Sequence, residues 1–168
     1  MSLPDLAAIL WRQRELLERL VYRLECEQLL LAAGRTRWLG KATSEVESLL
    51  NELGVLELQR AAIADGAARE LGLTTGAGLQ DLAAASQPPW TQVLLEHRNA
   101  LLTLTAELAV LAETNRHLVT SGMAAVETTL AAIGVPREPT AVSYDAQGRN
   151  RGQGRGRGAP SGFVDRAL

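Results

Sequence analysis

Side chains that could perform acid–base, nucleophilic or metal chemistry are few in this sequence. The two histidines, His97 and His117, stand twenty positions apart, and no cysteines or carboxylates near them have the spacing of a metal site. The single cysteine, Cys26, lies between Glu25 and Glu27, whose negative charges disfavour the thiolate that a nucleophile requires. No glycine-rich phosphate loop follows a strand. We therefore predict a protein that is not an enzyme and that holds no metal and no cofactor.

The remaining polar candidates have structural interpretations. His97 falls on an apolar seam, which favours a buried or hairpin-facing histidine over a chemical role. Asn115 falls on the same seam, where a buried Asn can fix the register of packed helices at a cost in stability. The carboxylate pair Glu45 and Glu47, like the pair that flanks Cys26, is expected on a solvated helix face and needs no functional role.

The composition predicts an all-α protein. Hydrophobic residues make up 46% of the 168 positions but aromatic residues only 4%, so Leu, Ala and Val must supply the core. Straight-chain residues and Ala lose little on entering a helix. One cysteine excludes an intramolecular disulfide framework, and no basic stretch precedes an apolar run as in a secretory signal. The longest apolar runs are far below the ~20 residues that span a bilayer, so we expect a cytoplasmic protein.

Apolar residues at heptad-like spacing predict helices over about 3–33, 36–72, 79–85 and 88–133. Short connections between long helices favour antiparallel neighbours. We expect a long antiparallel helical hairpin or coiled-coil bundle over residues 1–135. The last helix, about 70 Å long at 1.5 Å per residue, should lie along the first two and outrun them.

Each of the three long helices carries an apolar seam. The first comprises Leu3, Leu6, Leu10, Leu17, Leu20, Leu24 and Leu31, interrupted by the polar residues Gln13 and Glu27. The second comprises Leu39, Ala42, Val46, Leu49, Leu53, Leu56, Arg60, Ile63 and Ala67. The seam of the last helix comprises Leu94, His97, Leu101, Leu104, Leu108, Leu111, Asn115, Leu118, Gly122, Ala125 and Thr129.

Residues 136–168 form a Gly/Arg-rich, low-complexity segment that is predicted to be a disordered tail, because it has too few apolar residues to order itself. The charge divides at the same place. Residues 1–139 carry 12 basic and 17 acidic side chains, a net of −5, whereas residues 140–168 carry five Arg against two Asp, a net of +3. The body is therefore mildly acidic and the tail basic.

Several segments resemble the FlgN family of flagellar export chaperones, in a form similar to that of high-GC Gram-positive bacteria. The resemblance rests on the order and spacing of Leu10-Trp11-Arg12-Gln13-Arg14-Glu15-Leu16-Leu17, Glu25-Cys26-Glu27-Gln28-Leu29-Leu30-Leu31-Ala32-Ala33-Gly34, Arg37-Trp38-Leu39, Ala42-Thr43-Ser44-Glu45-Val46, Leu108, Glu113-Thr114-Asn115-Arg116-His117-Leu118 and Tyr144-Asp145-Ala146-Gln147-Gly148-Arg149. It covers most of residues 6–149. The Arg-Gly run and the ending Gly162-Phe163-Val164-Asp165-Arg166-Ala167-Leu168 depart from the family pattern.

The resemblance implies a cytosolic chaperone of type III flagellar export. Such chaperones bind hook-associated (hook–filament junction) proteins, prevent their premature assembly and deliver them to the export apparatus. The family binds its clients through the C-terminal region, which corresponds here to the end of the last long helix. The expected partner-binding residues are the apolar residues of that end, Leu118, Val119, Met123, Val126, Leu130 and Ile133. An amphipathic helix edge suits docking of a partner helix, but the same residues could instead pack on the first two helices.

Two alternatives stay open at this point. A structural coiled-coil scaffold would show the same heptads and would form a fixed homo-oligomer. An RNA-binding protein could use the Arg-Gly tail for phosphate contacts. Against RNA binding, only four Arg lie in the run, no aromatic residues are interleaved with them, and the body is acidic.

Overall fold

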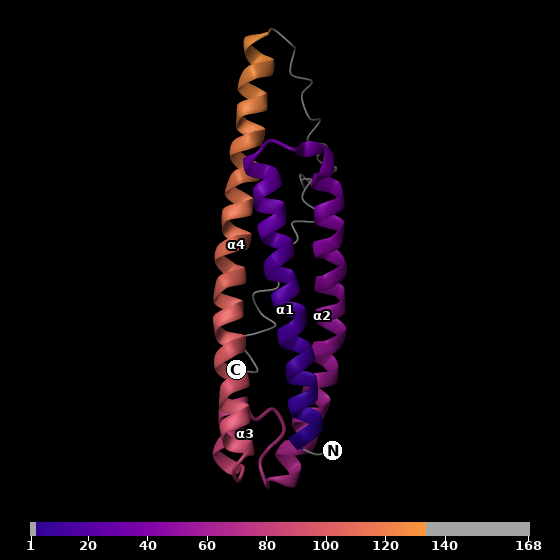
Figure 1. Ribbon diagram of the computed structural model, residues 1–168, viewed down its shortest axis with the longest axis vertical. Coiled ribbons are helices and arrows are strands. Elements are labelled where there is room, and N and C mark those ends of the chain that lie inside the picture. The colour runs from indigo at the N-terminus through magenta and orange to yellow at the C-terminus, as the bar shows by residue number, and fades with distance from the viewer. Residues whose placement is uncertain (1–2, 134–168) are drawn as a thin grey trace, which may run out of the picture.

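The computed structural model describes residues 3–133 as an elongated, all-helical bundle (Figure 1). The predicted all-α class is confirmed over these residues. The predicted tail, residues 136–168, lies outside the described part of the chain. The helices are α1 (Leu3–Ala32), α2 (Thr36–Glu70), α3 (Leu79–Ala85) and α4 (Trp90–Ala132). Within residues 3–133, none of these helices combines the length and apolar character required to cross a bilayer.

Helix α1 is the central element, because both other long helices pack on it. The α1–α2 pair is antiparallel: Gln13 bonds to Glu57 near the start of α1, and Glu27 bonds to Thr43 near its end. Helix α4 runs parallel to α1 instead. The short helix α3 packs on α4 at the end of the bundle where α4 begins (Figure 1).

The core is built from the apolar seams of the three long helices. Its largest fully buried side chains are leucines from α1, α3 and α4, namely Leu6, Leu10, Leu79, Leu82, Leu94 and Leu101. The buried α2 residues that join the same cluster include Val46, Leu49 and Leu56. Burial of side chains of this size contributes roughly 1.5–3 kcal/mol each. The fully buried leucines of α4 belong to its first half, so that half anchors the helix.

Helix α4 begins two residues later than its predicted start at residue 88. Pro89 is the N-cap residue rather than part of the first turn. A short turn precedes it, in which the Thr91 hydroxyl donates a hydrogen bond to the Ser86 carbonyl oxygen at 2.7 Å. Ser86, which is buried, in turn donates to the Leu82 carbonyl oxygen at 2.6 Å. These side-chain bonds satisfy backbone acceptors at the α3–α4 junction that helical bonding leaves open.

The end of α4 extends beyond the helices on which it packs (Figure 1). Asn115 lies level with Glu27, to which it donates a hydrogen bond, and with Thr43, which donates to the same Glu27 carboxylate. From that level α1 and α2 continue only to Ala32 and Thr36, five and seven residues on, whereas α4 continues for 17 residues to Ala132. At 1.5 Å per residue, the last 15 Å or so of α4 therefore has no neighbouring long helix.

Candidate functional site

The protruding end of α4 carries an apolar stripe, defined here as Val119, Met123, Val126, Leu130 and Ile133. These five residues are 41–67% exposed, and every residue from 119 to 133 is exposed. Leu118, the sixth expected partner-binding residue, is half-buried and still faces the bundle. A row of large apolar side chains that stays in contact with water is a feature of interaction surfaces.

The stripe does not simply continue the seam that faces α1. Beyond Leu118, the positions that continue that seam are Gly122, Ala125 and Thr129, which are small. The stripe residues follow one another at steps of four and three, as in a coiled-coil seam. At 100° per residue they lie roughly a quarter turn away from the α1-facing seam. The end of α4 therefore carries a second heptad seam, on a different face of the helix from the seam that packs on α1.

A polar layer lies at the base of this end and links all three long helices. The Asn115 side-chain amide of α4 donates to the Leu24 carbonyl oxygen at 3.0 Å and to a Glu27 carboxylate oxygen at 3.1 Å, both in α1. The other Glu27 oxygen accepts a hydrogen bond from the Thr43 hydroxyl of α2 at 2.8 Å. Asn115 is 5% exposed, so its bond to the Leu24 carbonyl oxygen is shielded from water, whereas the bond between Thr43 and Glu27 is exposed. The layer ties the level and rotation of α4 to the α1–α2 pair.

The expectation that Glu27 lies on a solvated face is wrong. Its side chain is half-buried and accepts hydrogen bonds from both neighbouring helices. The residue spacing contained the signal, because Glu27 follows Leu20 by seven residues on the apolar seam of α1. The role of Thr43 could not be predicted from the sequence alone. It depends on which residues of α2 lie beside Glu27 once the two helices have packed. Three segments of the family resemblance meet at this layer.

His97 is buried, 2% exposed, at the opposite half of the α1–α4 contact. Its ring stands edge-on to Trp11, with the ring centroids 5.1 Å apart. Its Nδ1 atom has no hydrogen-bond partner among the described residues. Burial, and next the neighbouring Arg14 guanidinium, lower the pKa of His97 below its usual value, although Glu96 acts in the opposite direction. A neutral imidazole enclosed in this way is suited to packing rather than to proton transfer.

A second buried polar group joins α1 to α2. Gln13, 5% exposed, donates a hydrogen bond to Glu57, whose other carboxylate oxygen accepts two bonds from the Arg60 guanidinium at 3.0 and 3.1 Å. The Arg60 and Glu57 side chains are only 7% and 11% exposed. The ionic pair is therefore satisfied within the bundle and is a packing feature of the α1–α2 contact.

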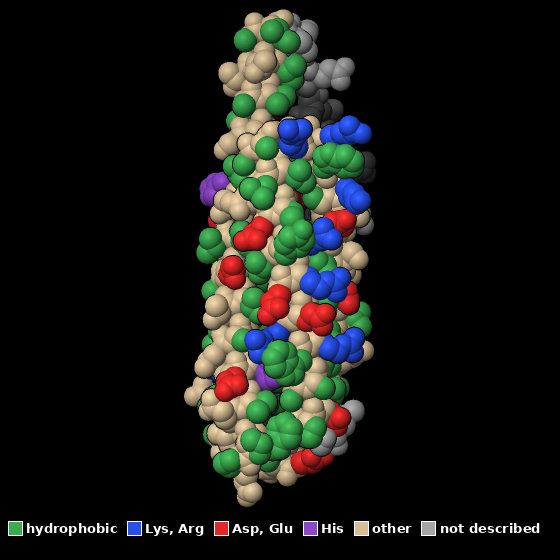
Figure 2. Space-filling view, viewed as in Figure 1, with side chains coloured by type: hydrophobic (Ala, Val, Ile, Leu, Met, Phe, Trp, Pro, Cys, Tyr) green, Lys and Arg blue, Asp and Glu red, His purple; other side chains and the backbone are tan. Residues whose placement is uncertain are grey.

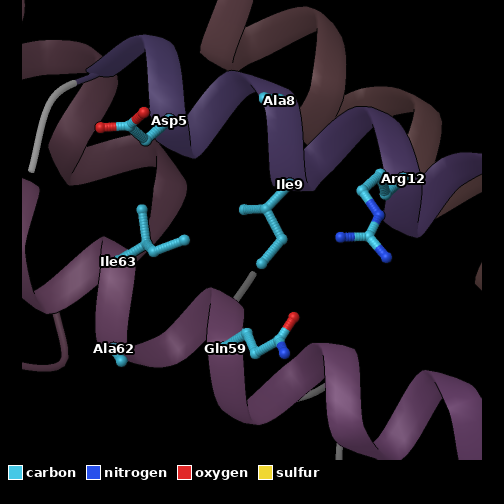
Figure 3. A pocket seen from close by; sticks show the side chains of 7 residues that line it. All are labelled: Asp5, Ala8, Ile9, Arg12, Gln59, Ala62 and Ile63. Carbon is cyan, nitrogen blue, oxygen red and sulfur yellow. The ribbon is translucent and has the colours of Figure 1, made fainter.

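An open groove lies between α1 and α2 (Figure 3). Ile9 and Ile63 point toward one another across it, and the ionisable residues that line it are Asp5 and Arg12 (Figure 3). Neither His nor Cys reaches this groove. Over residues 3–133, no cluster of three or more His, Cys, Asp or Glu side chains is arranged to hold a metal ion. Cys26 is a half-buried free thiol. The apolar stripe of α4 is thus the surface that most needs a functional explanation.

Comparison with known proteins agrees with the family resemblance. The family model described as FlgN protein matches residues 1–152, which include all the described helices. No curated protein matches the chain. No solved structure matches it either. Since the matched region covers most of its 168 residues, this chain belongs to the FlgN protein family, a family of flagellar export chaperones.

Proposed function

We propose that the protein is a type III flagellar export chaperone that holds hook-associated proteins before their export, and that its client docks on the apolar stripe of α4. The observation that carries this proposal is the exposure of five large apolar side chains at the end of α4, four of which lie beyond the ends of α1 and α2. A client helix laid on the stripe would complete a bundle there and remove these side chains from water.

The geometry of the stripe favours a helical client. Its residues repeat at heptad spacing over 15 positions, about 20 Å of helix. A partner helix that binds in this mode would insert its own apolar residues at the same spacing. Full burial of a Val, Leu, Ile or Met side chain contributes roughly 1.5–3 kcal/mol. Burial of these five half-exposed side chains would therefore favour binding, and it would be offset in part by the entropy cost of association.

The test is a binding titration of the purified chain with hook-associated proteins from the same host. Met123→Asp and Leu130→Asp should each weaken client binding by at least about 30-fold, because an aspartate would be buried unpaired in the interface. Helix content should stay unchanged, since both side chains are exposed in the free chain. Leu118→Asp is a poorer probe because its half-buried side chain also supports the bundle.

Val110→Asp is the matched control. Val110 lies on the same helix and is 67% exposed, compared with 62% for Met123, but it is not part of the stripe. It should leave client binding unchanged. Equal losses for Val110→Asp and Met123→Asp would refute docking on the stripe. A wild-type chain that binds no hook-associated protein and forms a fixed homo-oligomer would instead support the scaffold alternative.

A further inference from the structure

The charges of the bundle are separated along its long axis. The end above the Asn115 layer, residues 28–44 and 116–133, carries four basic side chains and one acidic one, a net of +3. The rest of residues 3–133 carries seven basic and 15 acidic side chains, a net of −8. The end with the apolar stripe is therefore positively charged, whereas the rest of residues 3–133 is acidic.

Three of those cations lie in the corner, defined here as residues 33–41, where α1 passes into α2. Arg35, Arg37 and Lys41 are exposed, and no acidic residue lies between positions 28 and 44. Among the described residues, Arg35 and Lys41 have no ion-pair partner, while the Arg37 guanidinium stacks 4.9 Å from the Trp38 ring centroid. Trp38 is itself 50% exposed. The corner thus combines unneutralised positive charge with an exposed aromatic surface.

The corner and the stripe are close along the bundle axis. Counting from the Asn115 layer, Ala32 and Thr36 lie level with about residues 120–122 of α4. On the face shown in Figure 2, basic side chains gather where the α1–α2 pair ends, beside the protruding part of α4. Seven-residue steps back from Val119 lead to Ala112 and Thr105, which are half-buried, whereas the same steps back from Met123 lead to Arg116 and Ala109, which are exposed. The Val119 edge of the stripe therefore borders the bundle-facing side of α4, and a partner on this edge would sit near the corner.

We propose that this combined surface selects an amphipathic helix whose polar positions carry carboxylates, with its apolar side on the stripe and its acidic side chains on Arg35, Arg37 and Lys41. This rests on the proposed docking of a client at the end of α4. Opposite charges speed encounter and reject partners of the wrong sign. The charge also argues against the chain's own residues 134–168 as the occupant, since they carry six Arg and only three acidic residues.

The test uses two synthetic peptides of two to three heptads, each stapled so that it is helical in solution. Both have the same Leu and Val positions, and their polar positions are Glu in one and Lys in the other. The full-length chain should bind the Glu peptide at least about tenfold more tightly than the Lys peptide, and the preference should shrink at high salt. The double variant Arg35→Glu/Arg37→Glu should reverse the preference. Arg12→Glu, on the exposed surface of α1 far from the corner, should leave it unchanged.

Other outcomes would overturn the proposal. Equal binding of both peptides would remove the role of the corner, even if hook-associated proteins bind the stripe. A charge preference without any binding of hook-associated proteins would keep this inference and reject the proposed function. A wild-type dimer that dissociates on Met123→Asp would make a second copy the occupant. Tighter peptide binding after removal of residues 134–168 would assign the surface to the chain's own tail.

Discussion

Asn115 should be coupled energetically to Glu27, because its amide donates to the Glu27 carboxylate at 3.1 Å in a partly buried position. A hydrogen bond to a charged group contributes about 1.5–3 kcal/mol. Glu27 is only half-buried, so water reduces this value and we expect a coupling of about 1–2 kcal/mol. Asn115→Ala alone should cost somewhat more, about 2–3 kcal/mol, since it also removes the bond to the Leu24 carbonyl oxygen.

The assay is a double-mutant cycle in which urea unfolding is followed by helical circular dichroism for Asn115→Ala, Glu27→Ala and the double variant. Asn115→Ala combined with Glu52→Ala is the control, because Glu52 is nine residues along α2 from Thr43, about 14 Å away. The control pair should be additive within about 0.5 kcal/mol. A coupling between Asn115 and Glu27 that is no larger than this control would refute the register role of the layer.

Three further results are expected. The pKa of His97 is lowered from 6.5 in the folded state, so the unfolded chain takes up a proton first as the pH falls. The contribution of His97 to the free energy of unfolding is therefore fully present above pH 6.5 and is lost below it. His97→Gln should reduce the resulting fall in Tm between about pH 7.5 and pH 5. Glu57→Ala should cost about 3–5 kcal/mol in urea unfolding because it leaves the buried Arg60 unpaired, whereas Glu52→Ala, which breaks only an exposed pair with Arg19, should cost less than about 1 kcal/mol. Removal of residues 150–168 should leave Tm unchanged, because this segment has few apolar residues to bury; a fall in Tm would show that it packs on the bundle.

The helices of this fold could be predicted from the sequence, but not their packing partners. Heptad spacing identifies an apolar face on each long segment, and this is a local property. The helix on which α4 packs is determined by residues 71–89, which connect α2 to α4 across the end of the bundle. This connection includes α3, which packs on α4 and buries Leu79 and Leu82. Those leucines are visible in the sequence, but the direction in which they turn the chain is a tertiary property. The parallel pairing of α4 with α1 therefore follows only from the structure.

Polar positions within the seams were harder to interpret than apolar ones. Asn115 and His97 stand where leucine is expected, which marks them as unusual in a single sequence. Their partners lie on other helices: Asn115 bonds to Glu27, which also bonds to Thr43, and His97 contacts the Trp11 ring. From sequence alone, these partner residues would ordinarily be assigned to the surface. A hydrogen bond between helices depends on their relative level, and a shift of one turn, about 5.4 Å, would change every partner.

The position where the bundle ends is nevertheless encoded in α4. If α4 packed on α1 along its whole length, the seam positions Gly122, Ala125 and Thr129 would need large apolar side chains, as at Leu101. They are small, and a Cβ atom added at Gly122 would meet no atom within 4 Å. The large apolar residues move instead to the neighbouring stripe. A helix end with no partner would be expected to carry polar residues both on the α1-facing seam and on the stripe, since exposed apolar rows favour aggregation. The retention of a heptad seam in a new direction is therefore the sequence-level argument that this end of α4 is built to receive another helix.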